Sequence, residues 1–497
     1  MSFTRIFSAA PLQIAQALIG FAAIAAFTRL MSAEEFGRYA LALSASMLAH
    51  TLAFTWAEAA AYRFFAAAKA EGRLRPHFAT LLALCIGLAV GTVALTALLL
   101  FLVGAHRELV TLTLFAAGSA VFRFLTRIVR ETERAALETQ RYAAAESAYL
   151  AIGFAAGIAF LTVFDLGAAA PFAGLMLAGA IMLLVDAPRL FQRAKGGEVS
   201  IDRVYHYAAY GAPLAAALAV DLGVQTLARF ILADQAGAAE LGAYAAAFGL
   251  ARPLDIIFMW AGAALMPALM AAHDERGADA ARAEAKRIFT LVAAIAAPAA
   301  LGLALIAEPL SRLLIGPALS AGAAHTLPWL ALAALLSGFN LYYWSEAFAL
   351  RRRTGVRALI MTLPGFAQIA LTLWFAPLFG AAGAAIAAAC AAALGFLLLA
   401  LIGRQFLPLP LPFAALARIA AACGVMALVI LALPRGGDLV TLLLSVLFGA
   451  LAYGAAAIFL NIGGLKGSLG ALSKTFAAKL RPPVHASFTD RANVRAP

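Results

Sequence analysis

Four arginines recur along one apolar stretch at spacings that suit a single helical face. The row consists of Arg123, Arg127, Arg130 and Arg134. Because they are four, three and four residues apart, an α-helix carries all four on one side. A guanidinium can bind two phosphate oxygens at once, so this row suits an entering diphosphate group. The alternative is that the arginines from Arg127 onward reach toward the membrane surface, with Glu131 as a partner. Arg123 is too deep for that.

A second set of polar residues lies in two apolar stretches of the second half: Asp221, Gln225, Arg229, Arg252 and Asp255. The first three share one helical face, at steps of four residues. Asp221 and Arg229 are two turns apart, roughly 12 Å, so we expect the acid to pair with Arg252 on a neighbouring helix. That pair is either structural, or it opens when Arg252 meets an anionic substrate. Arg229 is expected to be an anchor or a gate.

Five titratable residues inside apolar stretches are candidates for coupling to protons or sodium: His50, Glu58, Asp221, Asp255 and Glu346. Histidine titrates near neutral pH, and burial can bring a carboxyl group into the same range. Glu346 also has a simpler interpretation, which is to neutralise the Arg351–Arg353 run that follows it. Asp186, beside Pro188, is expected to lie at an interfacial helix end.

Uncharged polar side chains are a third group, suited to hydrogen bonds with sugar hydroxyls: Gln13, Gln16, Gln225 and Asn340. Polar contacts that hold helices together explain them equally well. The three cysteines, Cys85, Cys390 and Cys423, lie in apolar runs without a CxxC or Cys/His pattern. The sequence therefore predicts no metal site, no disulfide and no cofactor.

These residues are embedded in a chain whose composition excludes a soluble enzyme. Of its 497 residues 64% are hydrophobic and 12% are charged, where soluble domains have about 25% charged residues. About 20 apolar residues in a helix cross a hydrocarbon core. The sequence predicts an all-α polytopic membrane protein with about fourteen transmembrane helices: Ser8–Leu30, Gly37–Tyr62, Phe78–Gly104, Glu108–Ile128, Ala143–Phe164, Ala168–Pro188, Ala208–Leu232, Leu241–Met270, Phe289–Ala307, Thr326–Leu350, Val356–Pro377, Ala381–Ile402, Phe413–Leu433 and Leu439–Leu460.

The positive charge lies mainly on one side of these helices. Lysine and arginine concentrate in the loops after the even-numbered segments and in the tail, so these loops and both termini are predicted to be cytoplasmic. The net charge of +12 follows from this asymmetry and suits an anionic leaflet, so no nucleic-acid partner is predicted. The loops of the opposite face are short, which argues against a membrane polymerase or glycosyltransferase.

The two halves of the chain resemble each other at an offset of about 200–205 residues, unless the likeness is chance in an alanine-rich chain. The matched pairs include Ala10-Pro11-Leu12 with Ala212-Pro213-Leu214, Glu35-Phe36-Gly37 with Glu240-Leu241-Gly242, and Trp56 with Trp260. The offset spans six helices, which predicts two similarly oriented lobes. The expected parts are an N-lobe (1–190), a cytoplasmic inter-lobe loop (191–206), a C-lobe (207–403), two additional helices (404–462) and a basic, disordered tail (463–497).

Prolines within the predicted helices mark hinges, because proline lacks the amide proton and its ring clashes with the preceding turn. Pro11 and Pro213 would bend the first helix of each lobe at the same level, and Pro253 is a further candidate. We therefore expect a V-shaped cavity between the lobes that opens to one side at a time.

Two turns complete the pattern: residues 29–39, with the sequence RLMSAEEFGRY, and residues 350–355, with the sequence LRRRTG. Together with twelve repeated helices plus two, they resemble the Wzx-type polysaccharide flippases of the multidrug/oligosaccharidyl-lipid/polysaccharide exporter superfamily. This resemblance implies alternating access through a cationic cavity, to which Arg63 would also contribute. It implies translocation of an undecaprenyl-diphosphate-linked oligosaccharide across the bacterial inner membrane for exopolysaccharide or O-antigen-type synthesis. A monomer that works with a polysaccharide polymerase and export proteins is expected.

Two other transport functions fit the same architecture. A lipid II flippase also has fourteen helices. A cation-coupled multidrug antiporter should have an acidic, aromatic-lined cavity, which the row of arginines disfavours.

Overall fold

The structure is a computed structural model that describes residues 3–434 and 439–466, with the side chains of 3–15 and 264–265 left undescribed. Within this part of the chain all regular elements are helices and no strand occurs, which confirms the predicted all-α fold. Ten described helices are long and apolar enough to span a membrane, and the bent pair α2 and α3 adds an eleventh span when counted as one. Most of the predicted tail lies outside the described residues.

The described elements are α1 (Phe3–Leu30), α2 (Ala33–Ala53), α3 (Thr55–Ala70), α4 (Leu74–Val103), α5 (Arg107–Ala135), α6 (Thr139–Thr162), η1 (Gly167–Ala169), α7 (Ala170–Ala194), α8 (Ile201–Ala236), α9 (Ala238–Ala251), α10 (Pro253–Leu305), α11 (Ala307–Leu314), α12 (Pro317–Phe339), η2 (Asn340–Trp344), α13 (Ser345–Ala349), α14 (Thr354–Gly403), α15 (Phe413–Ala432), α16 (Leu439–Phe459) and η3 (Ile462–Gly464).

All fourteen predicted segments fall on helices. α14 contains two predicted segments, and α10 contains the greater part of two others, Phe289–Ala307 and Leu241–Met270, the latter of which begins in α9. Both helices are broken, at Gly277 and Gly380, where the backbone leaves helical geometry at positive φ. Glycine adopts such a conformation without the steric cost that other residues meet. That all fourteen segments cross the membrane stays a prediction.

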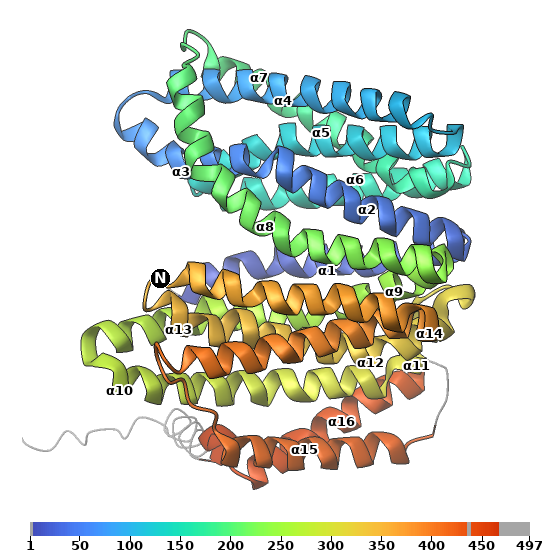
Figure 1. Cartoon of the computed structure of the whole chain (residues 1–497), viewed down its shortest axis with the longest axis vertical. Coiled ribbons are helices and arrows are strands. Elements are labelled where there is room, and N and C mark those ends of the chain that lie inside the picture. The colour runs from blue at the N-terminus through green and yellow to red at the C-terminus, as the bar shows by residue number, and fades with distance from the viewer. Residues whose placement is uncertain (1–2, 435–438, 467–497) are drawn as a thin grey trace, which may run out of the picture.

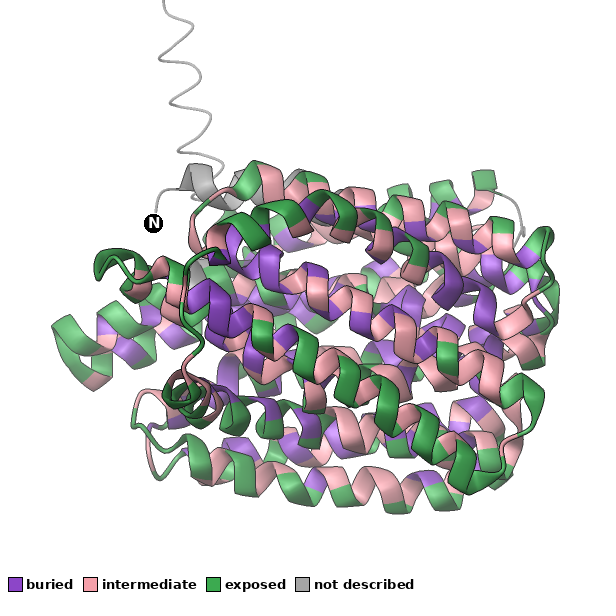
Figure 2. Cartoon of the chain, turned by 90° about the horizontal axis from the view of Figure 1, so that it is seen from above, coloured by how far each residue is buried: buried purple, intermediate pink, exposed green. Residues whose placement is uncertain are grey.

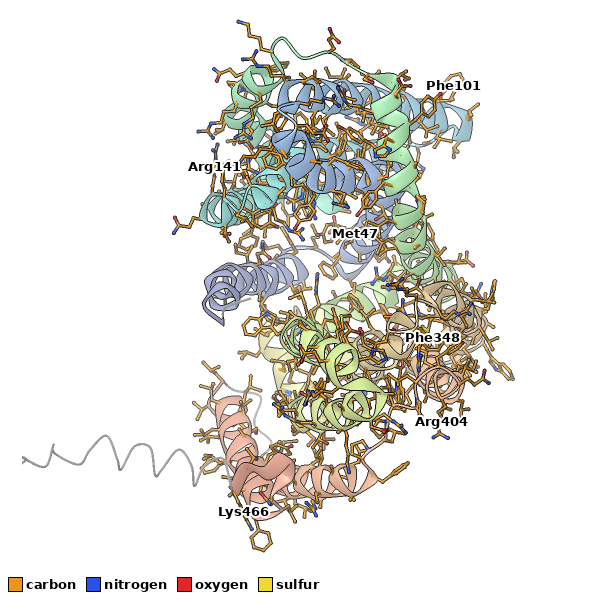
Figure 3. The ribbon with its side chains drawn as sticks, turned by 90° about the vertical axis from the view of Figure 1, so that its left-hand side faces the viewer. Met47, Phe101, Arg141, Phe348, Arg404 and Lys466 are labelled. Carbon is orange, nitrogen blue, oxygen red and sulfur yellow. The ribbon has the colours of Figure 1, made fainter. Side chains whose placement is uncertain are left out.

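The helices are arranged in two groups with α8 running between them (Figure 1). The first group comprises α2–α7, and the second comprises α9–α14 with α15 packed against α10. α2 packs against α9 across the two groups, and α8 contacts α2 and α3 on one side and α14 on the other. We call the end of the helices that carries the α3–α4 loop the inner face, and the end where α2 and α9 begin the outer face. Seen from the inner face, Met47 of α2 lies between the two groups (Figure 3).

The outward faces of the peripheral helices are apolar, as lipid contact requires. None of the most apolar stretch of α4 is buried, and Phe101 near its outer end is 82% exposed. Figure 2 shows this distribution, with buried residues concentrated toward the interior of the helix layers.

The second span of each half is broken rather than straight. α9 gives way to α10 at Arg252 and Pro253, where the missing proline amide proton explains the break. α2 and α3 meet at 49°, although the sequence there has no proline or glycine and predicts one continuous helix. At this break Phe54 is 1% exposed and its ring stacks on Phe124 of α5 with centroids 4.3 Å apart, so tertiary packing determines the bend.

Candidate functional site

The outer ends of the two groups are joined by a reciprocal contact between α2 and α9. A side chain at Gly37 would collide with the backbone carbonyl of Ala238, and a Cβ at Gly242 would lie 2.8 Å from the carbonyl oxygen of Ala33. The residues of each matched pair are 205 positions apart, 37 to 242 and 33 to 238. Such a reciprocal contact is what the predicted repeat requires on its axis. Only glycine allows the two backbones to approach this closely.

Two glutamates beside this contact hold corresponding turns. Glu35 accepts a hydrogen bond from the backbone N–H of Ser32 at 2.8 Å in a capping box, and its carboxylate lies against Gly167. Glu240 accepts a hydrogen bond from the N–H of Ala381 at 2.7 Å and lies against Gly380. Both glycines have positive φ and connect the fifth and sixth predicted segments of their halves. Both acids therefore hold turns of the backbone in place at the outer face.

Further bonds close the outer face between α1 and the α11–α12 turn. The Arg29 guanidinium donates to the carbonyl of Leu314 at 2.9 Å, and the N–H of Gly316 donates to Thr28 Oγ1 at 3.0 Å. Nearer the middle of the helices, Arg229 donates to Ser44 Oγ of α2 at 2.7 Å and lies over the Phe248 ring. Arg229 thus joins α8 to α2, an arrangement suited to the predicted anchor or gate.

The row of arginines on α5 faces carboxylates of neighbouring helices. Arg123 donates to Glu146 of α6 at 2.9 Å and lies 4.5 Å from the centre of the Tyr149 ring. Glu146 is 4% exposed. The sequence analysis did not single out Glu146, because spacing within one helix does not reveal which other helix will lie beside it.

Arg127 connects the row to the α2–α3 bend. Its Nε lies 3.4 Å from Glu58 Oε2, and its NH2 lies 3.4 Å from Glu131. Glu58 in turn is bonded through Oε1 to His50 Nε2 at 2.9 Å, so the two predicted coupling residues meet across the bend. The Glu131 partner foreseen as the alternative for Arg127 is therefore present.

The prediction that Asp186 lies at an interfacial helix end is wrong, because Asp186 is buried beside Arg130. The two side chains form an ion pair between α5 and α7, and Arg130 also contacts Glu133 at 2.6 Å. Asp186 is 2% exposed, so it lies in the core of the first group and not at an interfacial helix end. Arg134 lies 3.2 Å from Glu131, and Arg141 lies 2.9 Å from Glu133.

These contacts form three separate sets, which together we call the charge network: His50, Glu58, Arg127, Glu131 and Arg134; Arg123 and Glu146; and Arg130, Glu133, Glu138, Arg141 and Asp186. It contains six carboxylates, five guanidiniums and one imidazole. With all carboxylates ionised, the set that contains His50 has two carboxylates and two guanidiniums, so it is neutral when His50 is neutral. A proton on His50 would therefore give this set a net positive charge.

Asp221 and Glu346 of the second half share an unforeseen cation, Arg357 of α14. Asp221 accepts a hydrogen bond from Gln225 at 3.0 Å, and Arg357 attracts the carboxylates of Asp221 and Glu346. The expected pair between Asp221 and Arg252 is wrong, since no ion pair joins them. Arg357 also donates to Ser345 Oγ at 2.6 Å. Its signal in the sequence is hidden by the neighbouring arginine run.

Asn340, Pro213 and Gln16 lie on three different helical elements. Asn340 donates to the carbonyl of Ala392 at 2.9 Å from a π-helical turn, η2, and so links α12 to α14. Pro213 lies inside α8 and Gln16 is half-buried on α1. Pro11 and Gln13 belong to α1, but their side chains lie outside the described part of the structure.

Two exposed arginines of the predicted cationic set form no ion pair among the described residues. Arg63 of α3 and Arg252 at the α9–α10 break are both exposed, and the ion pairs found among the described residues include neither of them. Arg252 lies near enough to Asp255 to attract it. Of the predicted cations, these two are the most available to an anion.

Comparison with known proteins identifies a family match and solved structures with a similar fold. The family described as "Polysaccharide biosynthesis protein" matches residues 26–320. A search of curated proteins gives no match. Among solved structures, the fold is similar to a lipid II flippase, MurJ, in an inward closed conformation, with 14% identity over 90% of this chain and 98% of that one and a TM-score of 0.72. It is also similar to an inward-facing multidrug resistance MATE transporter of the MOP superfamily, with 17% identity over 82% and 95% and a TM-score of 0.56.

Proposed function

The chain belongs to the polysaccharide biosynthesis protein family, and from this premise we propose that it is a flippase for lipid-linked oligosaccharides. It would carry an undecaprenyl-diphosphate-linked repeat unit from the cytoplasmic to the outer leaflet of the bacterial inner membrane, upstream of a polymerase and export proteins. The family match is the observation that carries the proposal. The helical fold similar to flippases and transporters supports a carrier function without catalysis.

The packing of the two groups supports alternating access between lobes. We assign residues 1–190 to an N-lobe, 191–206 to a linker and 207–403 to a C-lobe, with 404–462 as added helices. The reciprocal Gly37 and Gly242 contact closes the outer face in this conformation. The breaks in α2–α3 and α9–α10 and the proline in α8 supply the bends that opening would require.

Arg252 and Arg63 are the proposed diphosphate contacts, because an unpaired exposed guanidinium can bind phosphate without first leaving a carboxylate. Arg252→Ala and Arg63→Ala should each slow translocation by roughly 10- to 100-fold, the factor for losing a hydrogen bond to a charged group. The measurement is translocation of a fluorescent polyprenyl-diphosphate oligosaccharide in proteoliposomes. Arg418→Ala on α15, also exposed, is the control and should leave the rate unchanged.

The same assay separates the alternatives. The similarity to MurJ makes a lipid II flippase the second candidate, and parallel vesicles containing lipid II test it directly. If the wild-type protein moves neither lipid but exports cationic dyes against a proton gradient, the flippase proposal is wrong and an antiporter function replaces it.

Coupling to protons is proposed for the His50–Glu58 pair, with Asp221, Asp255 and Glu346 as weaker candidates and sodium as the other ion to test. Histidine changes charge in the physiological pH range, and the pair lies at the α2–α3 bend. The charged neighbours of Glu58 are Arg123 and Arg127. Arg127 and Arg134 already balance Glu58 and Glu131, so a proton on His50 gives the set at the bend a net positive charge, and its loss restores neutrality.

His50→Gln should therefore abolish the stimulation of translocation by a pH gradient, while keeping a hydrogen-bonding side chain beside Glu58. The measurement is the translocation rate in proteoliposomes with and without an imposed gradient, between about pH 6 and pH 8. His273→Gln, at a histidine that contacts only the exposed Asp274, should retain the stimulation. A His50→Gln protein that still responds fully to the gradient would contradict coupling at this pair.

A further inference from the structure

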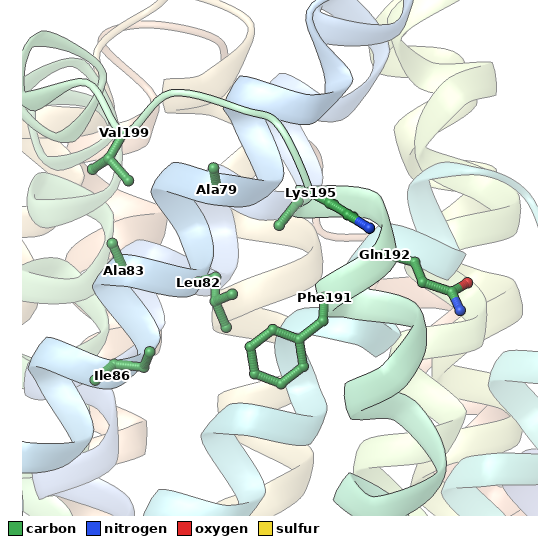
Figure 4. A pocket seen from close by; sticks show the side chains of 9 residues that line it. Ala79, Leu82, Ala83, Ile86, Phe191, Gln192, Lys195 and Val199 are labelled. Atoms are coloured by element: carbon green, nitrogen blue, oxygen red, sulfur yellow. The ribbon is translucent and has the colours of Figure 1, made fainter.

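A groove lies on the lipid-facing surface of the first group, near the inner face, between α4 and the C-terminal end of α7. It encloses about 540 Å³, and its walls are apolar, with Leu82 and Ile86 from α4 and Phe191 from α7. Figure 4 shows these side chains facing one space, with Lys195 and Gln192 on the α7 side. The walls extend roughly 7 to 18 Å from the inner end of α4, a depth at which lipid acyl chains lie.

The rim of the groove carries a lysine that forms no ion pair among the described residues. Lys195 and Gln192 are exposed, and neither forms an ion pair or side-chain hydrogen bond among the described contacts. Arg193, one turn away at most, lies over the Phe78 ring. An apolar trough with an unpaired ammonium at its rim matches a diacyl lipid whose headgroup is anionic.

The segment that links the two groups forms the inner end of the groove and is fixed there. Gly197 packs so closely on the backbone of Arg75 and Pro76 that a side chain would collide with them. The N–H of Ser200 donates to Thr80 Oγ1 at 3.3 Å, and Val199 lines the groove between these two contacts. A bound lipid would therefore contact the linker as well as α4 and α7.

We propose that this groove binds an anionic phospholipid of the inner-face leaflet, with its acyl chain against α4 and its phosphate at Lys195. The proposal does not depend on the transported substrate. α4 and α7 lie on the side of the first group that is remote from α9–α14 (Figure 1). A neutral or zwitterionic lipid would fill the apolar walls but leave Lys195 without its counter-charge.

The test is native mass spectrometry of the full chain with phosphatidylglycerol and phosphatidylethanolamine of the same acyl composition, in competition. The wild-type protein should retain phosphatidylglycerol preferentially. Lys195→Gln should lower that retention by about fivefold, and Ala83→Trp, which fills the groove from an exposed position, should abolish it.

Two matched variants act as controls. Lys69→Gln removes the same charge at the end of α3, and Ala94→Trp adds the same ring on α4 beyond the groove. Both should retain phosphatidylglycerol like the wild type. Equal retention of the two lipids by the wild type, or an equal loss in Lys69→Gln, would overturn the proposal.

Discussion

Gly37→Leu is expected to lower translocation by about 5- to 150-fold while leaving the protein folded. The new side chain would enter the space of the Ala238 carbonyl, and the backbone of α9 can yield only by moving away from α2. Overpacking of this kind costs about 1–3 kcal/mol. It destabilises only the conformation in which α2 and α9 are in contact at the outer face. The population therefore shifts toward a conformation in which the two helices are apart.

Two measurements check this prediction. The translocation assay gives the rate, and spin labels at Glu34 and Gln235, both exposed near the outer face, report the separation of the two proposed lobes. Gly242→Leu should reproduce the effect, because the contact is reciprocal. Gly91→Leu on α4, where a side chain meets no atom within 4 Å, is the control. An unchanged label distance in Gly37→Leu would show that the contact is not part of the closed state.

Asp186→Ala is expected to cause the largest loss of stability, about 3–5 kcal/mol, because it leaves Arg130 buried without its partner on α7. The remaining contact of Arg130 with Glu133 is within the same helix and also serves Arg141. Removing the acid therefore disturbs a connected part of the charge network. Thermal unfolding in detergent, followed by circular dichroism, measures the effect.

An exposed ion pair on α10 provides the control for this prediction. Asp279 contacts Arg282 on the surface of α10, and Asp279→Ala should change the unfolding temperature little, since water replaces the lost contact. Asp186→Asn keeps an oxygen acceptor for Arg130 and should fall between the two. If Asp186→Ala unfolds at the temperature of the wild type, the ion pair is not a stabilising element of the first group.

Helix positions were predictable from the sequence because lipid imposes a simple rule on length and hydropathy. Residues 74–103 and 439–459 illustrate this, since each apolar run became one helix. The α2–α3 bend was not predictable, because Phe54 stacks on a residue 70 positions away and no proline or glycine marks the site. Local sequence records backbone preferences but not the tertiary packing that overrides them.

The candidate site was predictable in part for the same reason. The contact of Arg127 with Glu131 follows from helical periodicity. The partners of Arg123 and Arg130 lie on α6 and α7, and periodicity within α5 does not identify neighbouring helices. The repeat stays a prediction; the structure shows that Glu35 and Glu240 have similar surroundings, since each carboxylate lies against a glycine with positive φ.

The charge network also constrains how the protein is made. α5 must enter the bilayer with several arginines, each costing about 2.5–3.5 kcal/mol at the membrane centre. Two of the acids that compensate them, Glu146 and Asp186, belong to α6 and α7 and are synthesised after it. Stable integration of α5 thus depends on residues that the ribosome has yet to add. We therefore expect α5 to be integrated stably only once α7 has emerged, with the first group inserted as one unit and not helix by helix.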